Sequence, residues 1–162
     1  MKVALYKSAH DGRWLDNAIN ALSGFGGYSH AELVFSNGIS FSSTMRDPSV
    51  DSLGRPKPDG TRFKQIDYGE HPERWDLIEL KIGLMAEAYI AQFCRDQIDA
   101  RYDFWGCMRF AVPFVKQHED KWFCSEVVTA ALKIVGYEPL RDQKPHKVSP
   151  NYLARLLARK GQ

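Results

Sequence analysis

The chain has 162 residues, of which 44% are hydrophobic and 26% are charged, and its formal net charge at pH 7 is +2. This length suits one domain with a buried core, so residues 1–162 are predicted to form a single domain. The small net charge disfavours a nucleic-acid partner, and no apolar run approaches the ~18 residues that a membrane span needs. Three widely separated cysteines argue against a disulfide framework, and the first residues lack a signal-peptide core. We therefore expect a cytoplasmic protein that binds neither nucleic acid nor membrane.

The chain is predicted to begin with a strand and a helix. Residues 2–7 alternate between apolar and polar side chains, as in a short half-buried strand. Asp11 can cap a helix that ends before the glycines of residues 24–27. The apolar face of this helix would be Trp14, Leu15, Ala18, Ile19 and Leu22.

A group of strands follows. Residues 29–35 and 39–44 are predicted to form a hairpin, because Asn37-Gly38 between them is a strong tight-turn signal. Residues 45–60, which contain several prolines and a glycine, are predicted to form a long loop, and loops of that length are often functional. Two further strands are expected, at residues 61–68 and 75–82.

The remainder is predicted to be mostly helical, at residues 84–101, 103–115, 123–136 and 149–159. Asp103 can cap the second of these helices, and Ser149-Pro150 begins the last, with proline in its first turn. Strands are thus separated from helices along the chain. This order favours an α+β fold, with an antiparallel sheet packed against helices, over an alternating α/β fold.

Cys124 is the most informative residue, because it lies at the predicted start of a helix. It is followed at helical spacings by an apolar face formed by Val127, Val128, Ala131, Leu132 and Val135. The first turn of a helix carries the positive end of its dipole, which favours the nucleophilic thiolate. The alternative is a small core residue, as expected for Cys94 and Cys107, because unpaired cysteines are commonly buried. Cys124 is therefore a candidate nucleophile or a core residue.

His30 is the candidate base for such a nucleophile. It begins a strand that leads into the core, whereas the other four histidines lie in polar segments predicted to be loops: His10, His71, His118 and His146. Histidine titrates near neutral pH and can activate a thiol. The alternative for His30 is a structural histidine at the end of a sheet.

A third group should orient the imidazole. Glu32 lies two residues further on and shares a strand face with His30. Ser42 or Ser40, across the predicted hairpin, is the alternative. Tyr28 and Trp122 flank the candidate pair in sequence and are candidates for lining a cleft or contacting an oxyanion.

The segment His30-Ala31-Glu32 also matches half of the zinc-deaminase signature. The other half requires Pro-Cys-x-x-Cys, but Cys124 is followed by Ser-Glu-Val without a second thiol. The signature histidine should also open a helix, whereas this stretch is predicted to be a strand. We therefore reject a deaminase, and we expect neither a metal nor a cofactor.

Several short motifs together resemble the permuted papain-like amidases of the NlpC superfamily. They span roughly residues 28 to 153 and comprise Tyr28–Phe35, Tyr102-Asp103-Phe104, Phe123–Val128 and Ser149-Pro150. Ordinary members place the cysteine helix before the histidine strand. In the permuted branch, which includes lecithin retinol acyltransferase-like proteins, the histidine comes first, as it does here.

The resemblance implies a circularly permuted papain-like (NlpC-type) fold with Cys124 as the nucleophile and His30 as the general base. The third polar residue of the family usually sits on the strand after the histidine. In this chain the polar residues of that strand all carry hydroxyl groups: Ser40, Ser42, Ser43 and Thr44. Glu32 would then take the place of the family's third residue.

The predicted activity is cleavage of an amide bond in a peptide or cell-wall peptide through an acyl-enzyme. The Cys124 thiolate would attack the carbonyl, and His30 would protonate the leaving amine and then activate water. The backbone N–H of Cys124 would bind the oxyanion. Two alternatives use the same fold: a thiol acyltransferase acting on an acyl substrate, and a binding or structural module without turnover.

Overall fold

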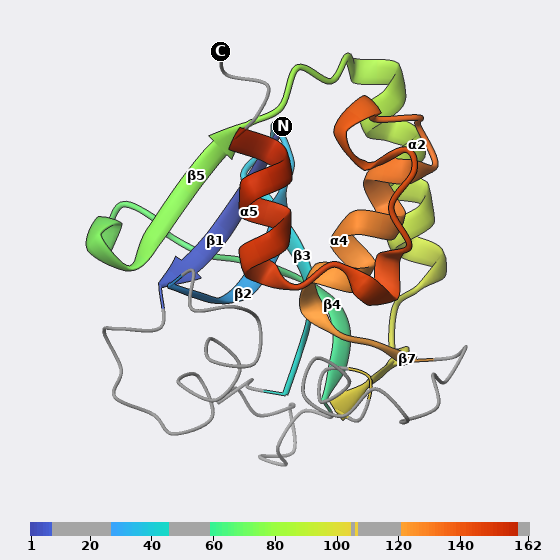
Figure 1. The fold of residues 1–162 in the computed structure, drawn as a ribbon. Coiled ribbons are helices and arrows are strands. Elements are labelled where there is room, and N and C mark those ends of the chain that lie inside the picture. The colour runs from blue at the N-terminus through green and yellow to red at the C-terminus, as the bar shows by residue number, and fades with distance from the viewer. Residues whose placement is uncertain (8–26, 46–58, 105, 107–120, 159–162) are drawn as a thin grey trace.

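The computed structural model describes residues 1–7, 27–45, 59–104, 106 and 121–158 (Figure 1). In this part of the chain a five-stranded sheet has the order β4-β3-β2-β1-β5, and all neighbouring strands are antiparallel. Its strands are β1 (Lys2–Lys7), β2 (Tyr28–Val34), β3 (Ile39–Thr44), β4 (Gly60–Gln65) and β5 (Trp75–Glu79). Two short strands, β6 (Arg101–Tyr102) and β7 (Lys121–Trp122), form a separate parallel pair.

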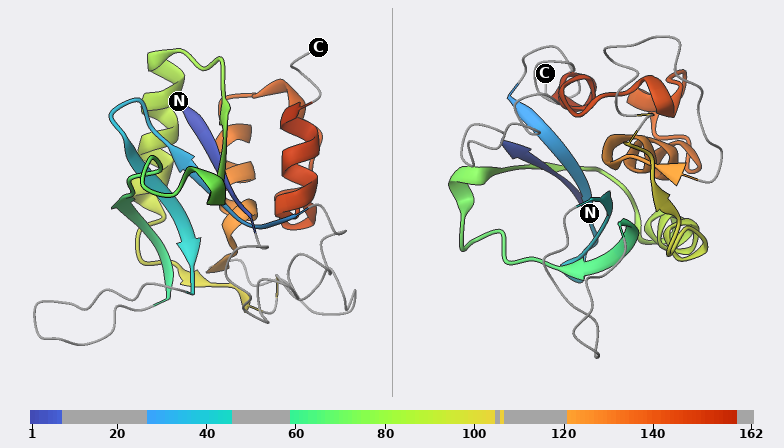
Figure 2. Two further views of the ribbon diagram at one scale, coloured as in Figure 1. Left: turned by 90° about the vertical axis from the view of Figure 1, so that its left-hand side faces the viewer. Right: turned by 90° about the horizontal axis from the view of Figure 1, so that it is seen from below.

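Three α-helices of the described residues line one side of the sheet: α2 (Leu84–Asp96), α4 (Cys124–Lys133) and α5 (Pro150–Ala158). They lie side by side with α4 in the middle, as the view from below shows (Figure 2). Short 3-10 helices connect the main elements: η2 (Pro72–Arg74), η3 (Glu138–Leu140) and η4 (Pro145–Lys147). The predicted α+β class and its antiparallel sheet against helices are confirmed. The helix expected after Asp11 and most of the expected 45–60 loop and 103–115 helix lie outside the described residues.

The hairpin predicted from Asn37-Gly38 is confirmed as β2 and β3. Gly38 has a φ of +81°, a left-handed conformation that glycine adopts without steric penalty. Its N–H donates to the carbonyl of Phe35, and the N–H of Phe35 donates to the carbonyl of Ile39 at 2.9 Å. The turn therefore fixes the register in which Leu33 pairs with Phe41.

The core lies between the sheet and α4. Four residues of the face that the spacing predicted have zero exposure in α4: Val127, Val128, Ala131 and Leu132. Val135, the fifth residue predicted for that face, follows the end of α4 and is only partly buried. Phe41 and Leu33, a register pair on β3 and β2, are equally buried on the sheet side. Because side chains alternate along a strand, the neighbouring residues of β2 and β3 lie on the opposite face. That opposite face carries His30 and Glu32 of β2 and Ser40 and Ser42 of β3.

Helix α2 is shorter than the helix predicted over residues 84–101, so the predicted C-terminal end of this helix is wrong. The helix ends at Asp96, and Asp99 takes a left-handed φ of +65°. The chain then returns to β4, where the N–H of Thr61 donates to the carbonyl of Ala100 and the N–H of Asp99 donates to the carbonyl of Thr61. These tertiary hydrogen bonds replace the helical ones that the local pattern favours.

The cap predicted at Ser149 is present, and Asp103 makes a hydrogen bond of the same kind. The N–H of Tyr152 donates to Ser149 Oγ, which caps α5 directly before Pro150. The N–H of Gly106 donates to Asp103 Oδ1 at 2.8 Å, the contact expected of a capping aspartate. Parallel pairing of β6 with β7 places Asp103 beside the residue that precedes Cys124.

Candidate active site

The candidate site lies where β2 starts and α4 begins, at one end of the sheet. Ser43 near the end of β3 donates to the carbonyl of Trp122 at 2.6 Å, which ties the start of α4 to the sheet. Tyr6 of β1 pairs with His30 of β2, and Lys7 pairs with Tyr28, so Ser29 is an extra residue on β2. Such bulges bend a strand and change the direction of neighbouring side chains. The bulge therefore immediately precedes the histidine of the site.

Cys124 and His30 meet at this position. Cys124 is 2% exposed, and the side chain of His30 is 20% exposed. Burial alone would lower the pKa of His30, but the charge of a Cys124 thiolate and hydrogen bonds to Cys124 and Glu32 raise this pKa to about 9 from 6.5. The imidazole is thus held in its protonated form by partners that carry negative charge.

Glu32 is the centre of a hydrogen-bonded cluster, although its own side chain is only 1% exposed. Its Oε1 accepts from His30 Nε2 at 2.9 Å and lies 2.5 Å from Lys64 Nζ, while its Oε2 accepts from the Tyr68 hydroxyl at 2.9 Å. Burial would raise the pKa of Glu32, but the hydrogen bond from His30 and the charge of Lys64 lower it to about 2. Glu32 is therefore an anion satisfied on both oxygens.

The direction of each hydrogen bond follows from this charge. An ionised carboxylate only accepts, so His30 Nε2 must carry a proton. Ser42 Oγ lies 3.2 Å from the same nitrogen but donates its own proton to the carbonyl of Ala31 at 2.8 Å, so it accepts from His30. With Nε2 committed to donation, Nδ1 is the ring nitrogen left for exchange with a thiol.

A hydroxyl chain continues behind Glu32. Because Tyr68 donates to Glu32, the Ser40 hydroxyl 2.7 Å away must donate to Tyr68. Burial, together with the charge of Glu32, raises the pKa of Tyr68 above its usual range, so Tyr68 remains a donor at all ordinary pH values. The orientation of Glu32 is thereby fixed from the side opposite His30.

The other two predicted residues lie nearby, but their polar atoms have partners. The Tyr28 hydroxyl donates to Asp76 Oδ2, and burial together with this hydrogen bond raises the pKa of Tyr28 to about 12. The indole N–H of Trp122 donates to Gln97 Oε1 at 2.9 Å. The only side-chain donor of Trp122 is therefore bound to Gln97, and its contact with a cleft or an oxyanion stays a prediction.

The sequence prediction missed Lys64 and Tyr68. Lys64 lies on β4 opposite Ser40, a register that alternation along the predicted strand could have suggested. Tyr68 follows the end of β4 and reaches Glu32 only because the chain between β4 and β5 folds back over the sheet. No local signal in the sequence indicates that contact.

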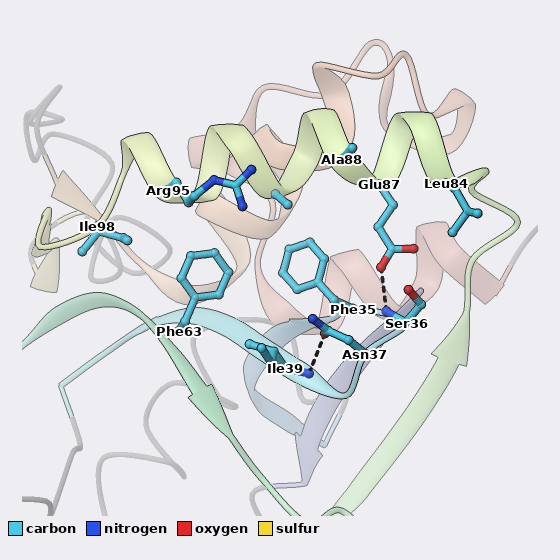
Figure 3. A pocket seen from close by; sticks show the side chains of 11 residues that line it. Phe35, Ser36, Asn37, Ile39, Phe63, Leu84, Glu87, Ala88, Arg95 and Ile98 are labelled. Carbon is cyan, nitrogen blue, oxygen red and sulfur yellow. Dashed lines mark hydrogen bonds between the residues drawn. The ribbon is translucent and has the colours of Figure 1, made fainter.

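A second feature is a groove of about 550 Å³ between α2 and the hairpin of β2 and β3 (Figure 3). Its walls are mostly apolar, with Phe35 and Phe63 facing the helix, and Glu87 accepts from the N–H of Ser36 at 2.6 Å. None of its lining residues belongs to the cluster around Glu32. The groove is therefore separate from the candidate active site.

No family model, no curated protein and no solved structure matches this chain. Within the described segments, no group of three or more histidine, cysteine or carboxylate side chains is arranged to hold a metal ion. The helices found there are also too short or too polar to cross a bilayer. The geometry of the site is therefore what bears on the function of this protein.

Proposed function

We propose that this protein is a cysteine-dependent hydrolase that cleaves an amide bond in a peptide or cell-wall peptide through an acyl-enzyme. We further propose that its α+β domain is a circularly permuted papain-like fold of the NlpC type. The observation that carries the proposal is the continuous chain of Cys124, His30 and Glu32 at the start of a helix. Thiol, imidazole and carboxylate in this order are the parts that nucleophilic acyl transfer requires.

In the first step the Cys124 thiolate attacks the substrate carbonyl carbon. The oxyanion that forms lies at the N-terminus of α4, where first-turn backbone N–H groups have no intrahelical acceptor. Collapse of the intermediate breaks the C–N bond, and the proton on Nδ1 of His30 passes to the leaving amine. A thioester and a neutral imidazole remain.

In the second step neutral His30 takes a proton from water, and the resulting hydroxide attacks the thioester carbon. The carboxylic acid leaves, and the thiolate and imidazolium pair is restored. Glu32 keeps Nε2 protonated throughout, so Nδ1 is the nitrogen that both gives and receives the proton. The steps that form the thioester are the same for a hydrolase and for an acyltransferase. The two activities differ only in whether water or another nucleophile then accepts the acyl group.

The test is the pH dependence of alkylation by iodoacetamide, followed by peptide mapping of the modified cysteine. We expect iodoacetamide to modify Cys124 selectively in the folded protein near neutral pH, as it does a thiol activated by a neighbouring base. His30→Ala should remove this selective reaction. Cys94 is an internal control, because burial raises its pKa to about 12 and it should stay unlabelled in the folded protein.

Substrate assays then separate the candidate activities. Wild-type protein is screened against peptide amides and cell-wall peptides. The control is Cys124→Ala, which should fold like the wild type but have no activity. Full turnover by Cys124→Ala would refute the mechanism. If Cys124 reacts only after unfolding, the protein is a binding module and the proposal is wrong.

A further inference from the structure

We propose that Lys64 is a positioning residue that compensates the charge of Glu32 and thereby lets His30 act as a base once Cys124 has been acylated. This inference rests on the proposed hydrolase function. Lys64 is none of the three residues proposed as nucleophile, base and orienting carboxylate. Its proposed role is in the hydrolysis of the acyl-enzyme.

The geometry places two cations on one carboxylate oxygen. Glu32 Oε1 lies 2.9 Å from His30 Nε2 and 2.5 Å from Lys64 Nζ. Because His30 Nε2 and Lys64 Nζ contact the same oxygen, they lie within the ~4–6 Å over which one positive charge disfavours protonation of a neighbouring group. The Lys64 side chain is 27% exposed, so water screens it only in part.

The other groups that face His30 do not provide this positive charge. From α4 the facing group is Cys124, from β3 the neutral Ser42, and from β1 the phenol Tyr6, the register partner of His30. Trp75 of β5 contributes a neutral ring 6.5 Å away, centroid to centroid. Tyr68, which follows β4, is a donor to Glu32.

One further cation lies on the same strand as Lys64. Arg62 is two residues earlier on β4 and donates from Nη2 to the carbonyl of Thr44. This contact holds Arg62 toward the end of β3, whereas Lys64 contacts Glu32 itself. Among the described residues that face the site, Lys64 is thus the cation in direct contact with the orienting carboxylate.

The effect of Lys64 differs between the two halves of the reaction. In the resting protein, the Cys124 thiolate and Glu32 both favour imidazolium, so one nearby ammonium changes little. In the acyl-enzyme the thiolate is gone, and a lone Glu32 would still hold the proton on His30. Lys64 offsets that carboxylate charge, and neutral His30 can then accept a proton from water.

The experiment measures the His30 protonation directly. In the Cys124→Ala background, which lacks the thiolate as the acyl-enzyme does, the His30 imidazole is titrated by heteronuclear NMR. Lys64→Met should raise the His30 pKa by about one unit. Lys64→Arg, which keeps the charge, should leave it within a few tenths of a unit. Lys81→Met is the matched control, because Lys81 is exposed and remote from the cluster, and it should cause no shift.

An unchanged or lowered His30 pKa in Lys64→Met would overturn the proposal. If that variant does not fold, Lys64→Gln replaces it, since the amide still hydrogen-bonds to Glu32 but carries no charge. The titration needs no substrate, so its result is independent of the proposed hydrolysis. For an active protein, a second readout is kcat, which below pH 7 should fall up to tenfold in Lys64→Met without slower alkylation of Cys124.

Discussion

Replacing Glu32 by glutamine should destabilise the protein by about 3 kcal/mol at pH 7, although the two side chains have nearly the same shape. Glutamine leaves no cavity, so packing contributes little to this loss. The loss comes from charge: Glu32 is 1% exposed and its carboxylate is bound by His30, Lys64 and Tyr68. Removing it leaves the Lys64 ammonium without its counter-ion.

The magnitude follows from the pKa of Glu32, which falls from 4.5 to about 2 in the folded protein. A shift of that size corresponds to about 3 kcal/mol, because each pKa unit is ~1.4 kcal/mol. Breaking a buried ion pair by removing one partner gives a similar figure. Because the pKa is lowered on folding, this stability is fully present above about pH 4.5 and is lost as the pH falls toward 2.

The assay is urea unfolding at pH 7 and at pH 3. The control is Glu79→Gln, since Glu79 is 80% exposed in its ion pair with Lys2 and should contribute less than about 1 kcal/mol. The double variant Glu32→Gln/Lys64→Met should be more stable than the sum of the single changes predicts, because no unpaired charge remains. A loss no larger than that of Glu79→Gln, or one equal at both pH values, would refute the reasoning.

Two further predictions concern the fold. Phe41→Ala should lower the free energy of unfolding by about 3–5 kcal/mol, because Phe41 has zero exposure and packs 4.9 Å from the Phe63 ring between centroids; a loss below about 2 kcal/mol in urea unfolding would contradict this packing. Ser149→Ala should lower the melting temperature through a loss of about 1 kcal/mol at the cap of α5, whereas Ser149→Asp should largely retain stability. Equal melting temperatures for both Ser149 variants would argue against the cap.

The parts of the site that the sequence predicted are those set by local geometry. Glu32 shares a strand face with His30 because side chains repeat every second residue, and the two side chains do meet. Ser42 was an alternative to Glu32, and the structure places both on His30 Nε2. The catalytic roles of these residues remain predictions, while their proximity is a property of the fold.

The end of α2 shows where local pattern is insufficient. Residues 84–101 favour a helix by their own spacing, but backbone hydrogen bonds to Thr61 end it at Asp96. Those bonds depend on the position of β4, which lies more than thirty residues earlier in the chain. The spacing of residues within one segment contains no information about hydrogen bonds to a distant strand.

By itself the sequence determined the hairpin at Asn37-Gly38, the buried face of α4 and the cap at Ser149, because each depends on residues a few positions apart. It also determined the α+β class, because the order of strands and helices along the chain indicates it. The tertiary structure decided the meeting of His30 with Cys124 and the cluster around Glu32. The pairing of β4 with β3 places Lys64 next to Glu32, and the segment that follows β4 places Tyr68 there. A charge buried among distant segments is defined only when the whole sheet has formed, since each partner comes from a different part of the chain.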